Sequence, residues 1–291
     1  MNITAIILNY KNYKDVCSCI ISLEKQILPR DYKLKILIID NNSEDGCTEQ
    51  LQQIFPEHKY IFNRENYGFA KGVNQGIDLS YTESNYFLLV NNDAELSPQC
   101  LSELLFASNG EALVGPAIFY KNEPEIVWQG GGFYSKLKMN LTVPDKNKNH
   151  VSVNLKEVDF LSGCILLIPK KIIELNGKLD EKFFFYGEDL DFCLRAKKLG
   201  IKVLYCPEAK AFHNIKRIVI SRTSPFVLKN LAFSYHLIIK KHFPKLQTYG
   251  LFLFIFIYSP FRLYQIISGG NNWSNITSWI QGGIQGWKIK I

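Results

Sequence analysis

Features typical of disordered, secreted or membrane-spanning chains are missing from this sequence. Only 21% of its 291 residues are charged and 47% are hydrophobic, which excludes a disordered chain and allows a sizeable core. The seven cysteines are odd in number and scattered, so they predict neither a disulfide framework nor a zinc knuckle but buried thiols in a reducing compartment. Residues 1–10 read as a buried strand and not as a secretory signal. We therefore expect a globular, cytoplasmic protein.

Acidic side chains are absent from residues 209–291, where all charged residues are Lys or Arg. These basic residues contribute +11 to a net charge of +7, so residues 1–208 carry −4. Such a tail indicates contact with an anionic surface, either nucleic acid or anionic lipid. Its apolar run, residues 251–261, is shorter than the roughly 20 residues of a membrane-spanning helix, and we expect Pro260 and Arg262 to interrupt it. Residues 216–291 are thus predicted to form a helical, basic and apolar appendage.

We expect this appendage to dock on an anionic membrane surface, because basic side chains beside aromatic and aliphatic ones suit the bilayer interface. A plain packed appendage is the alternative. Nucleic acid is disfavoured as a partner.

Short apolar runs alternate with helical patterns in the first part of the chain. The runs indicate buried parallel strands at residues 4–8, 35–39, 60–62 and 86–90. Helices are predicted at residues 15–26, 44–54, 68–79 and 99–107, the last starting from Ser97-Pro98. This alternation predicts a doubly wound α/β domain. Further strands are predicted at residues 158–168, with an interruption at Ser162-Gly163, and at 202–205, and His213 is expected to end a strand. The domain ends near residue 215.

Between residues 110 and 158 the order of elements is less regular. The glycines at 130–132 and the polar run 144–150 suggest a loop or lid that crosses the front of the site. Polar residues also follow each predicted strand: Asn9 and Tyr10, then residues 40–43, 63–68 and 91–93. Ligands of such sheets bind at the carboxyl ends of the strands, so these segments together form the candidate site.

Three side chains suit metal binding and proton transfer. Asp93 offers the hard oxygen ligand that Mg²⁺ or Mn²⁺ prefers, although a polar turn explains it equally well. Asp189 lies at the start of a predicted helix, whose positive end favours the ionised form that a general base needs; helix capping is the alternative. A lone histidine such as His213 is more often structural, but a neutral imidazole could complete a metal site begun by Asp93.

Six segments and His213 occur in an order that carries a family resemblance. They are ILNYKN (7–12), IIDNNSEDG (38–46), ENYGFAKGVNQGI (65–77), LLVNNDAEL (88–96), FLSGCILLI (160–168) and FFFYGEDLDFCLRAKKLGIKVLYCPEA (183–209). Together they resemble the inverting family-2 glycosyltransferases of GT-A fold, especially the bacterial rhamnosyltransferase-like branch that builds lipopolysaccharide, capsule and cell-wall glycans. The resemblance implies a Rossmann-like, mostly parallel central sheet flanked by helices over residues 1–215.

The resemblance also implies a role for each matched residue. Asp40 is similar to the carboxylate that accepts the imide N–H of a pyrimidine base. Other matched segments of the family contact the donor. At the base and ribose these segments contain Asn9, Asn42, Asn66, Gly68 and Asn74. Asn91 and Asn92 would lie beside the diphosphate, and Glu188 also belongs to a substrate-binding segment. Asp93 matches the last acid of the metal-binding DxD motif, and His213 matches a metal-contacting histidine. Asp189 matches the catalytic base.

One residue departs from the family's motif. Asn91 replaces the first DxD carboxylate, a form that is common in the rhamnosyltransferase-like branch. An amide offsets no metal charge, so we expect weak metal binding in which the nucleotide supplies much of the coordination.

The function implied is transfer of rhamnose or another hexose from a UDP- or dTDP-sugar to a hydroxyl of a growing, lipid-linked cell-surface glycan, with Mg²⁺ or Mn²⁺ as cofactor. The protein would be peripheral on the inner face of the cell membrane. A catalytically silent nucleotide-sugar or glycan binder is the main alternative, because of Asn91. An oxidoreductase is disfavoured, since G-x-G-x-x-G is missing after the first strand. The sequence leaves open the donor sugar, the base, the acceptor, the linkage and the oligomeric state, homo-oligomers included.

Overall fold

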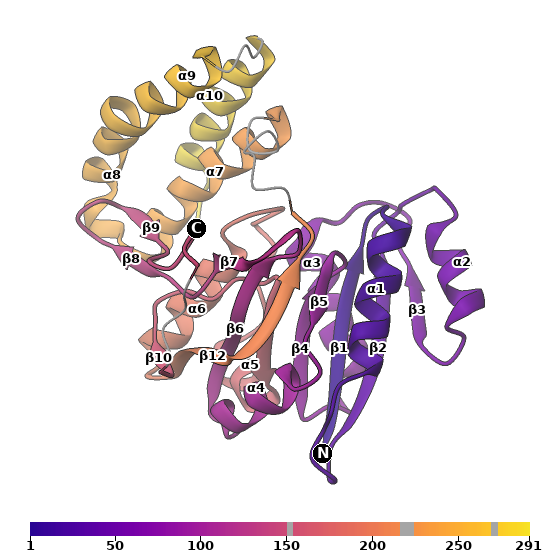
Figure 1. Ribbon diagram of the computed structural model, residues 1–291. Helices are drawn as coiled ribbons and strands as arrows, with labels where there is room; N and C mark the ends of the chain where they lie inside the picture. The colour runs from indigo at the N-terminus through magenta and orange to yellow at the C-terminus, as the bar shows by residue number, and fades with distance from the viewer. Residues whose placement is uncertain (150–153, 216–223, 269–272) are drawn as a thin grey trace.

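A mixed sheet covered by helices on both faces forms most of the molecule, and a group of helices from the C-terminal part of the chain packs beside it (Figure 1). The computed structural model describes residues 1–149, 154–215, 224–268 and 273–291. Three basic residues of the predicted tail, Lys216, Arg217 and Arg222, and His150 of the predicted lid lie outside the described residues.

The α/β part contains these elements in chain order: β1 (Asn2–Asn9), α1 (Tyr13–Glu24), β2 (Lys33–Asp40), α2 (Cys47–Ile54), β3 (Lys59–Phe62), α3 (Gly68–Ser80), β4 (Tyr86–Asn91), β5 (Ala94–Leu96), α4 (Cys100–Ser108), β6 (Ala112–Tyr120), β7 (Glu123–Gln129), β8 (Phe133–Ser135), β9 (Asn140–Thr142), β10 (Lys156–Glu157), β11 (Ile165–Pro169), α5 (Lys170–Asn176), α6 (Glu188–Lys198) and β12 (Lys202–His213). The remaining described elements are α7 (Pro225–His242), η2 (Pro244–Leu246), α8 (Gln247–Leu253), η3 (Phe254–Tyr258), α9 (Ser259–Ser268) and α10 (Trp273–Lys288).

The sheet brings the predicted polar segments to one edge. Its strand order is β10-β12-β6-β11-β4-β1-β2-β3, and β1 runs parallel to both β2 and β4. Asn9 is in register with Asp40, and Asp40 with Phe62. On the other side of β1, Leu8 pairs with Asn91. The ends of these four strands therefore lie side by side, as the sequence predicts for a doubly wound sheet.

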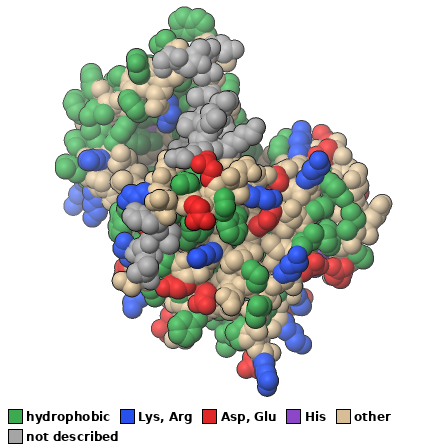
Figure 2. All heavy atoms as spheres, in the orientation of Figure 1, with side chains coloured by type: hydrophobic (Ala, Val, Ile, Leu, Met, Phe, Trp, Pro, Cys, Tyr) green, Lys and Arg blue, Asp and Glu red, His purple; other side chains and the backbone are tan. Residues whose placement is uncertain are grey.

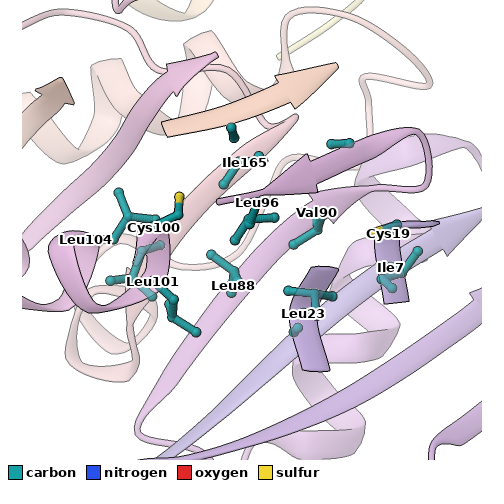
Figure 3. Packing of buried hydrophobic residues seen from close by; sticks show 14 of the residues in the cluster. Ile7, Cys19, Leu23, Leu88, Val90, Leu96, Cys100, Leu101, Leu104 and Ile165 are labelled. Atoms are coloured by element: carbon teal, nitrogen blue, oxygen red, sulfur yellow. The ribbon is translucent and has the colours of Figure 1, made fainter. Parts of the chain in front are cut away.

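Apolar side chains alternate between the two faces of the strands, so each face has its own core. In one core, Ile7, Leu88 and Val90 pack against Cys19 and Leu23 of α1 (Figure 3). The opposite core is formed by α3 and residues such as Ile6 and Ile39. Each fully buried large apolar side chain contributes about 1.5–3 kcal/mol to folding. Burial on both faces explains why these strands are nearly continuous apolar runs in the sequence.

Three predicted boundaries are wrong. Helix α4 is capped by Gln99 and not by Ser97, because the carbonyl of Ser97 accepts the Cys100 N–H (2.9 Å) in a turn before the helix. Within residues 158–168 only Ile165 onward is strand, while Phe160 makes an isolated bridge to Gly132. Strand β12 extends to His213, since it pairs along β6 and then with β5.

The helical run Pro244–Ile267 also corrects the sequence analysis. It covers 24 residues, and its most apolar 18-residue stretch has a mean hydropathy of 1.5, with 22% of that stretch buried. By length and composition it could cross a membrane, and Pro260 and Arg262 do not interrupt it. Pro260 stands at the start of α9, directly after the π-helical turn Phe254–Tyr258, whose wider spacing accommodates a ring that would clash with a regular α-helical turn.

Helix α7 joins the C-terminal helices to the α/β part. Its Leu237 and Ile238 share a buried cluster with Phe160, Phe183 and Leu190. The hairpin of β8 and β9 adds a second contact, because the Tyr134 ring stacks on Phe243 with 5.3 Å between ring centroids. The division into residues 1–215 and 216–291 stays a prediction, and the two parts share apolar core.

Candidate active site

The end of β2 is held by hydrogen bonds from the loop that follows it. Asp40 is buried, and its Oδ1 accepts the backbone N–H of Ser43 (2.7 Å). Asn42 turns the chain in the left-handed region, with φ 67°. Ser43 in turn accepts the backbone N–H of Lys11 from the loop after β1 (2.8 Å). A carboxylate is thereby fixed at the sheet edge, where a ligand's N–H could reach it.

Asn41 connects this loop to the start of α3. Its amide donates to Asn66 Oδ1 (2.8 Å), and its Oδ1 accepts the backbone N–H of Tyr67 (3.0 Å). Gly68 follows with φ +78°, and a Cβ there would overlap the carbonyl oxygen of Phe184. Phe69 N–H donates to the same carbonyl (2.8 Å). Only glycine permits this approach, which brings the 66–69 segment against the segment before Asp189.

The polar triplet Asn91-Asn92-Asp93 at the end of β4 contacts three other parts of the chain. Asn91 N–H donates to the carbonyl of Cys164 (2.8 Å), and Asn92 donates to Asn9 Oδ1 (2.9 Å). Asp93 Oδ1 lies 2.8 Å from His213 Nε2. The pairing of β5 with β12 explains this contact, because it places His213 opposite Ala94. Two residues that are 120 positions apart thus form one carboxylate–imidazole pair.

This pair fits a divalent cation in part. Asp93 is half-buried and His213 is buried with its ring edge against Trp128, 4.3 Å between ring centroids. His213 Nδ1 finds no hydrogen-bond partner among the described residues. One oxygen and one nitrogen donor suit a cation such as Mg²⁺ or Mn²⁺ that takes its other ligands from substrate phosphates and water.

Asp189 stands in the first turn of α6. Its Oδ1 accepts its neighbour Leu190's N–H (2.8 Å), and its Oδ2 accepts the N–H of Gly163 (3.1 Å). Desolvation by burial outweighs these hydrogen bonds and raises the pKa of Asp189 to about 6. The neighbouring Glu188 is buried, and burial followed by the charge of Asp189 raises its pKa well above the usual range. Asp189 can therefore exchange a proton near neutral pH.

The loop Gly163–Cys164 brings Asp93 and Asp189 to one place. The Gly163 N–H donates a hydrogen bond to Asp189 Oδ2. The Cys164 carbonyl accepts one from the N–H of Asn91, in the triplet that contains Asp93. Burial raises the pKa of the Cys164 thiol, and the negative charges of Asp93 and Asp189 raise it further. Hydrogen bonds thus connect the 91–93 triplet and Asp189 to the same short loop.

Two predicted donor contacts are occupied by the protein itself. Asn9 is fully buried, donating to Thr48 Oγ1 (3.0 Å) and accepting from Asn92, so that it orients the triplet. Asn74 donates to the Leu179 carbonyl and to Glu181, both at 2.9 Å, and accepts from Leu179 N–H. Their contact with base or ribose stays a prediction, while the structure gives both residues a positioning role.

Some residues that shape the site were not predicted. Ser234 of α7 donates to the carbonyl of Tyr186 (2.6 Å), just before the helix that carries Asp189. Asp191 in that helix lies within 2.7–2.8 Å of Lys241, His242 and Arg195. The contacts of Ser234, Lys241 and His242 leave no local pattern in the sequence, because they join segments about 50 residues apart, whereas Arg195 and Asp191 are four residues apart in α6. Helix α7 thus holds α6, the helix that carries Asp189, in place.

Comparisons with known proteins agree with this arrangement. Residues 4–175 match the family model described as Glycosyl transferase family 2. The chain is similar to the low-salt glycan biosynthesis hexosyltransferase Agl10 of Haloferax volcanii, 27% identical over 221 residues, which cover 73% of this chain and 67% of that protein. It is also similar to an N-acetylglucosaminyl-diphospho-decaprenol L-rhamnosyltransferase of Mycobacterium tuberculosis, 24% identical over 212 residues, covering 64% and 68%.

Among solved structures, GalNAc-T7 with UDP, GalNAc and Mn²⁺ superposes with a TM-score of 0.63 at 16% identity. The superposition covers 81% of this chain but only 48% of that one, so the chain spans about half of its length. At this identity the likeness concerns the fold alone. The predicted GT-A-like α/β fold with a C-terminal helical region is confirmed.

Proposed function

Since the chain belongs to glycosyl transferase family 2, we propose that it transfers rhamnose or another hexose from a UDP- or dTDP-sugar to a hydroxyl of a growing, lipid-linked cell-surface glycan. The observation that carries this proposal is the approach of Asp93 and Asp189 to the same loop, Gly163–Cys164. The names of the two relatives, a glycan-biosynthesis hexosyltransferase and a rhamnosyltransferase with a decaprenol-linked acceptor, support the sugar and the acceptor class.

Donor binding is assigned to the edge formed by β1, β2 and β4. Asp40 would accept the imide N–H of the pyrimidine, with Asn42, Asn66 and Gly68 along the base and ribose. Asn91 and Asn92 would lie beside the diphosphate. The amide network around Asn41 supports this assignment, because it fixes the loops before a ligand arrives.

Asp93 and His213 would hold Mg²⁺ or Mn²⁺, which supplies positive charge to the departing diphosphate when bound. Asn91 is neutral, so Asp93 is the only carboxylate of its triplet. We expect affinity for the ion to be low in the absence of a nucleotide.

Asp189 is the proposed general base in a single displacement. The acceptor O–H proton moves to its carboxylate as the oxygen forms a bond to the anomeric carbon. The bond from that carbon to the nucleoside diphosphate breaks on the opposite face, and the diphosphate leaves with the electron pair, so configuration inverts. Glu188 is buried beside Asp189 and would contact the substrate or orient the base.

The predicted division remains part of the proposal: residues 1–215 as the catalytic domain and residues 216–291 as a membrane-surface region. The exposed apolar residues of Pro244–Ile267, together with Lys245 and Arg262, support docking on an anionic bilayer. We place the protein on the inner face of the cell membrane, where soluble nucleotide sugars meet lipid-linked acceptors.

The test is release of nucleoside diphosphate from a panel of UDP- and dTDP-sugars, with a polyprenyl-diphosphate-linked saccharide as acceptor. We expect one donor to be consumed only when Mg²⁺ or Mn²⁺ is present, with loss of turnover on adding EDTA. Donor binding in calorimetry without any turnover, across donors and ions, would instead favour a silent binder, the alternative that Asn91 leaves open. Turnover unaffected by EDTA would refute the metal assignment.

A further inference from the structure

An apolar groove lies between two of the C-terminal helices, outside the site described above. It has a volume of about 490 Å³, within the range of ligand pockets. The run Pro244–Ile267 forms one wall with Phe254 and Leu263, and α10 forms the other with Trp279, Ile284 and Trp287. Ile280 and Ile284 are 47% and 50% exposed although they line the groove, so the residues that the structure describes leave about half of each uncovered.

Packing of α10 against α7 keeps the groove open. Gly282 lies on the backbone of Lys229 and Gly286 on that of Phe233, so α10 runs parallel to α7 and turns its small residues toward it. The larger residues of α10, such as Trp279, Ile284 and Trp287, lie on the neighbouring face and line the groove opposite the run Pro244–Ile267. Gly283 meets the ring of Phe254 at one point, where the two walls touch.

Charges near the groove are positive. Lys288 lines one end, and the ammonium of Lys240 bonds to the carbonyls of Trp287 and Ile289 beside it. No acidic residue occurs after Glu208. An apolar trough that ends at lysines matches a ligand with a hydrocarbon chain and an anionic head group.

The groove is one helix away from the catalytic segment. His236 of α7 lines the groove, whereas Ser234, on another face of α7, bonds to Tyr186 before the helix of Asp189. An α-helix is about 10 Å across, so the width of α7 separates the groove from the segment that precedes Asp189.

We propose that this groove binds the hydrocarbon chain of the lipid that carries the acceptor saccharide. The assignment rests on the proposed function for the identity of that lipid. Bulk phospholipid is disfavoured as the occupant because the exposed side chains of Pro244–Ile267 already offer it an outer surface, while the groove lies on the α7 side of the same helices. Seated there, the chain would hold its phosphate and sugar near Asp189.

A photoreactive farnesyl monophosphate tests the site without any transferase assay. After irradiation, mass spectrometry should find the label on peptides containing residues 251–263 and 279–288. The double substitution Ile280→Gln and Ile284→Gln should reduce labelling at least fivefold. Because both residues are half-exposed, folding should be retained, which circular dichroism would check. Ile267→Gln is the matched control, an exposed isoleucine of the same helices outside the groove, and should label as the wild type does.

Competition distinguishes the two sources of a hydrocarbon chain. Unlabelled farnesyl monophosphate should abolish labelling, whereas the same concentration of vesicular phosphatidylglycerol should leave most of it. Equal competition by both, or labelling that the double variant leaves unchanged, would overturn the proposal.

Kinetics then separate this proposal from the proposed function. In the double variant KM should rise at least fivefold for a polyprenyl-linked acceptor and stay constant for the same saccharide without a chain. Labelling in the groove without any sugar transfer would refute the proposed function alone. Sugar transfer without labelling in the groove would refute the groove alone.

Discussion

Asp189 has two properties that suit the general base we propose it to be, a fixed orientation and a raised pKa. Its oxygens are held by two backbone N–H groups, so its orientation is fixed before an acceptor binds. Burial raises its pKa to about 6, yet the side chain remains partly accessible. A surface aspartate used only for capping would have no reason to be desolvated in this way.

Replacing Asp189 by Asn should therefore stop turnover and spare donor binding. The amide keeps the shape of the side chain but cannot take a proton, and a positioned base contributes typically 10²–10⁴-fold. We expect kcat to fall by about that factor, while the Kd for the nucleoside diphosphate from calorimetry changes less than about threefold. A variant that retains full turnover would show that another group accepts the proton.

Activity should rise with pH through the pKa of Asp189. At pH 5, one unit below about 6, roughly a tenth of the side chain is ionised, so kcat/KM should be about tenfold below its plateau above pH 7. Because the folded pKa exceeds the unfolded value of about 3.9, the protonated form favours folding, and stability falls as pH rises from about 4 to 6. A flat profile of kcat/KM from pH 5 to 8, at fixed donor and metal concentrations, would contradict the assignment.

Individual site residues could be predicted where their chemistry is local. The structure places Asp40 at the last position of β2, Asp93 two residues beyond β4 and Asp189 in the first turn of α6, close to where the sequence predicts them. The positioning roles of Asn9 and Asn74 were not predicted, since their partners Thr48 and Glu181 are 39 and 107 positions away. Hydrogen bonds over such separations leave no periodic signal in the sequence.

Helix α6 is fixed to helix α7 by one buried carboxylate. Asp191 is fully buried, and Lys241, His242 and Arg195 all bond to it. The hydrogen bond from His242 and the positive charges of Arg195 and Lys241 hold the pKa of Asp191 well below its usual range, despite its burial. Its contribution to stability is therefore present above the unfolded pKa of about 3.9 and is lost as pH falls below it.

The substitution Asp191→Asn should destabilise the protein strongly. It removes the carboxylate that pairs with Arg195 and leaves Lys241 with Asp180 as its acidic partner, and breaking a buried ion pair typically costs about 3–5 kcal/mol. Asp78→Asn is a matched control, because its ion pair with Lys178 is largely exposed, and it should cost less than about 1 kcal/mol. Urea denaturation measures both. Equal stability of the two variants would mean that the Asp191 cluster does not tie the helices together.

Helices α7 and α10 pack through glycine, so a side chain there should separate them. Gly282→Val would drive methyl groups into the backbone of Lys229, and overpacking of this kind costs about 1–3 kcal/mol. The control is Gln285→Val, which introduces a valine at an exposed position of α10. A lower midpoint in thermal denaturation is expected for Gly282→Val alone. If both variants melt at the same temperature, the close packing has no energetic role.

Whole elements were predicted with uneven success, for physical reasons. Strands β1, β2 and β4 have buried apolar runs that identify them, whereas β3 lies at the edge of the sheet and is partly exposed. The run Pro244–Ile267 was underestimated because proline normally ends a helix, and the sequence does not reveal the π-helical turn that admits it. Tertiary packing decides such cases more than local propensity does.

The molecule as a whole presents two different surfaces. Over the α/β part, acidic and basic side chains are interspersed, whereas hydrophobic side chains gather over α8 and α9 (Figure 2). Phe252, Phe256, Phe261, Tyr264 and Ile267 are each more than half exposed. Large apolar side chains concentrated on one face of a soluble body mark a surface that contacts another apolar phase.

Removing three of these side chains should release the protein from membranes. Each phenylalanine gains up to about 1.5–3 kcal/mol on burial, so Phe252→Ser, Phe256→Ser and Phe261→Ser together should reduce partitioning at least tenfold. Phe106→Ser is the matched control, because Phe106 is 87% exposed but lies on α4 of the α/β part. Co-sedimentation with phosphatidylglycerol vesicles measures the effect. Lysine and arginine add about 1 kcal/mol each near an anionic surface, so binding should weaken with phosphatidylcholine or high salt. Equal sedimentation of both variants would exclude α8 and α9 as the docking surface.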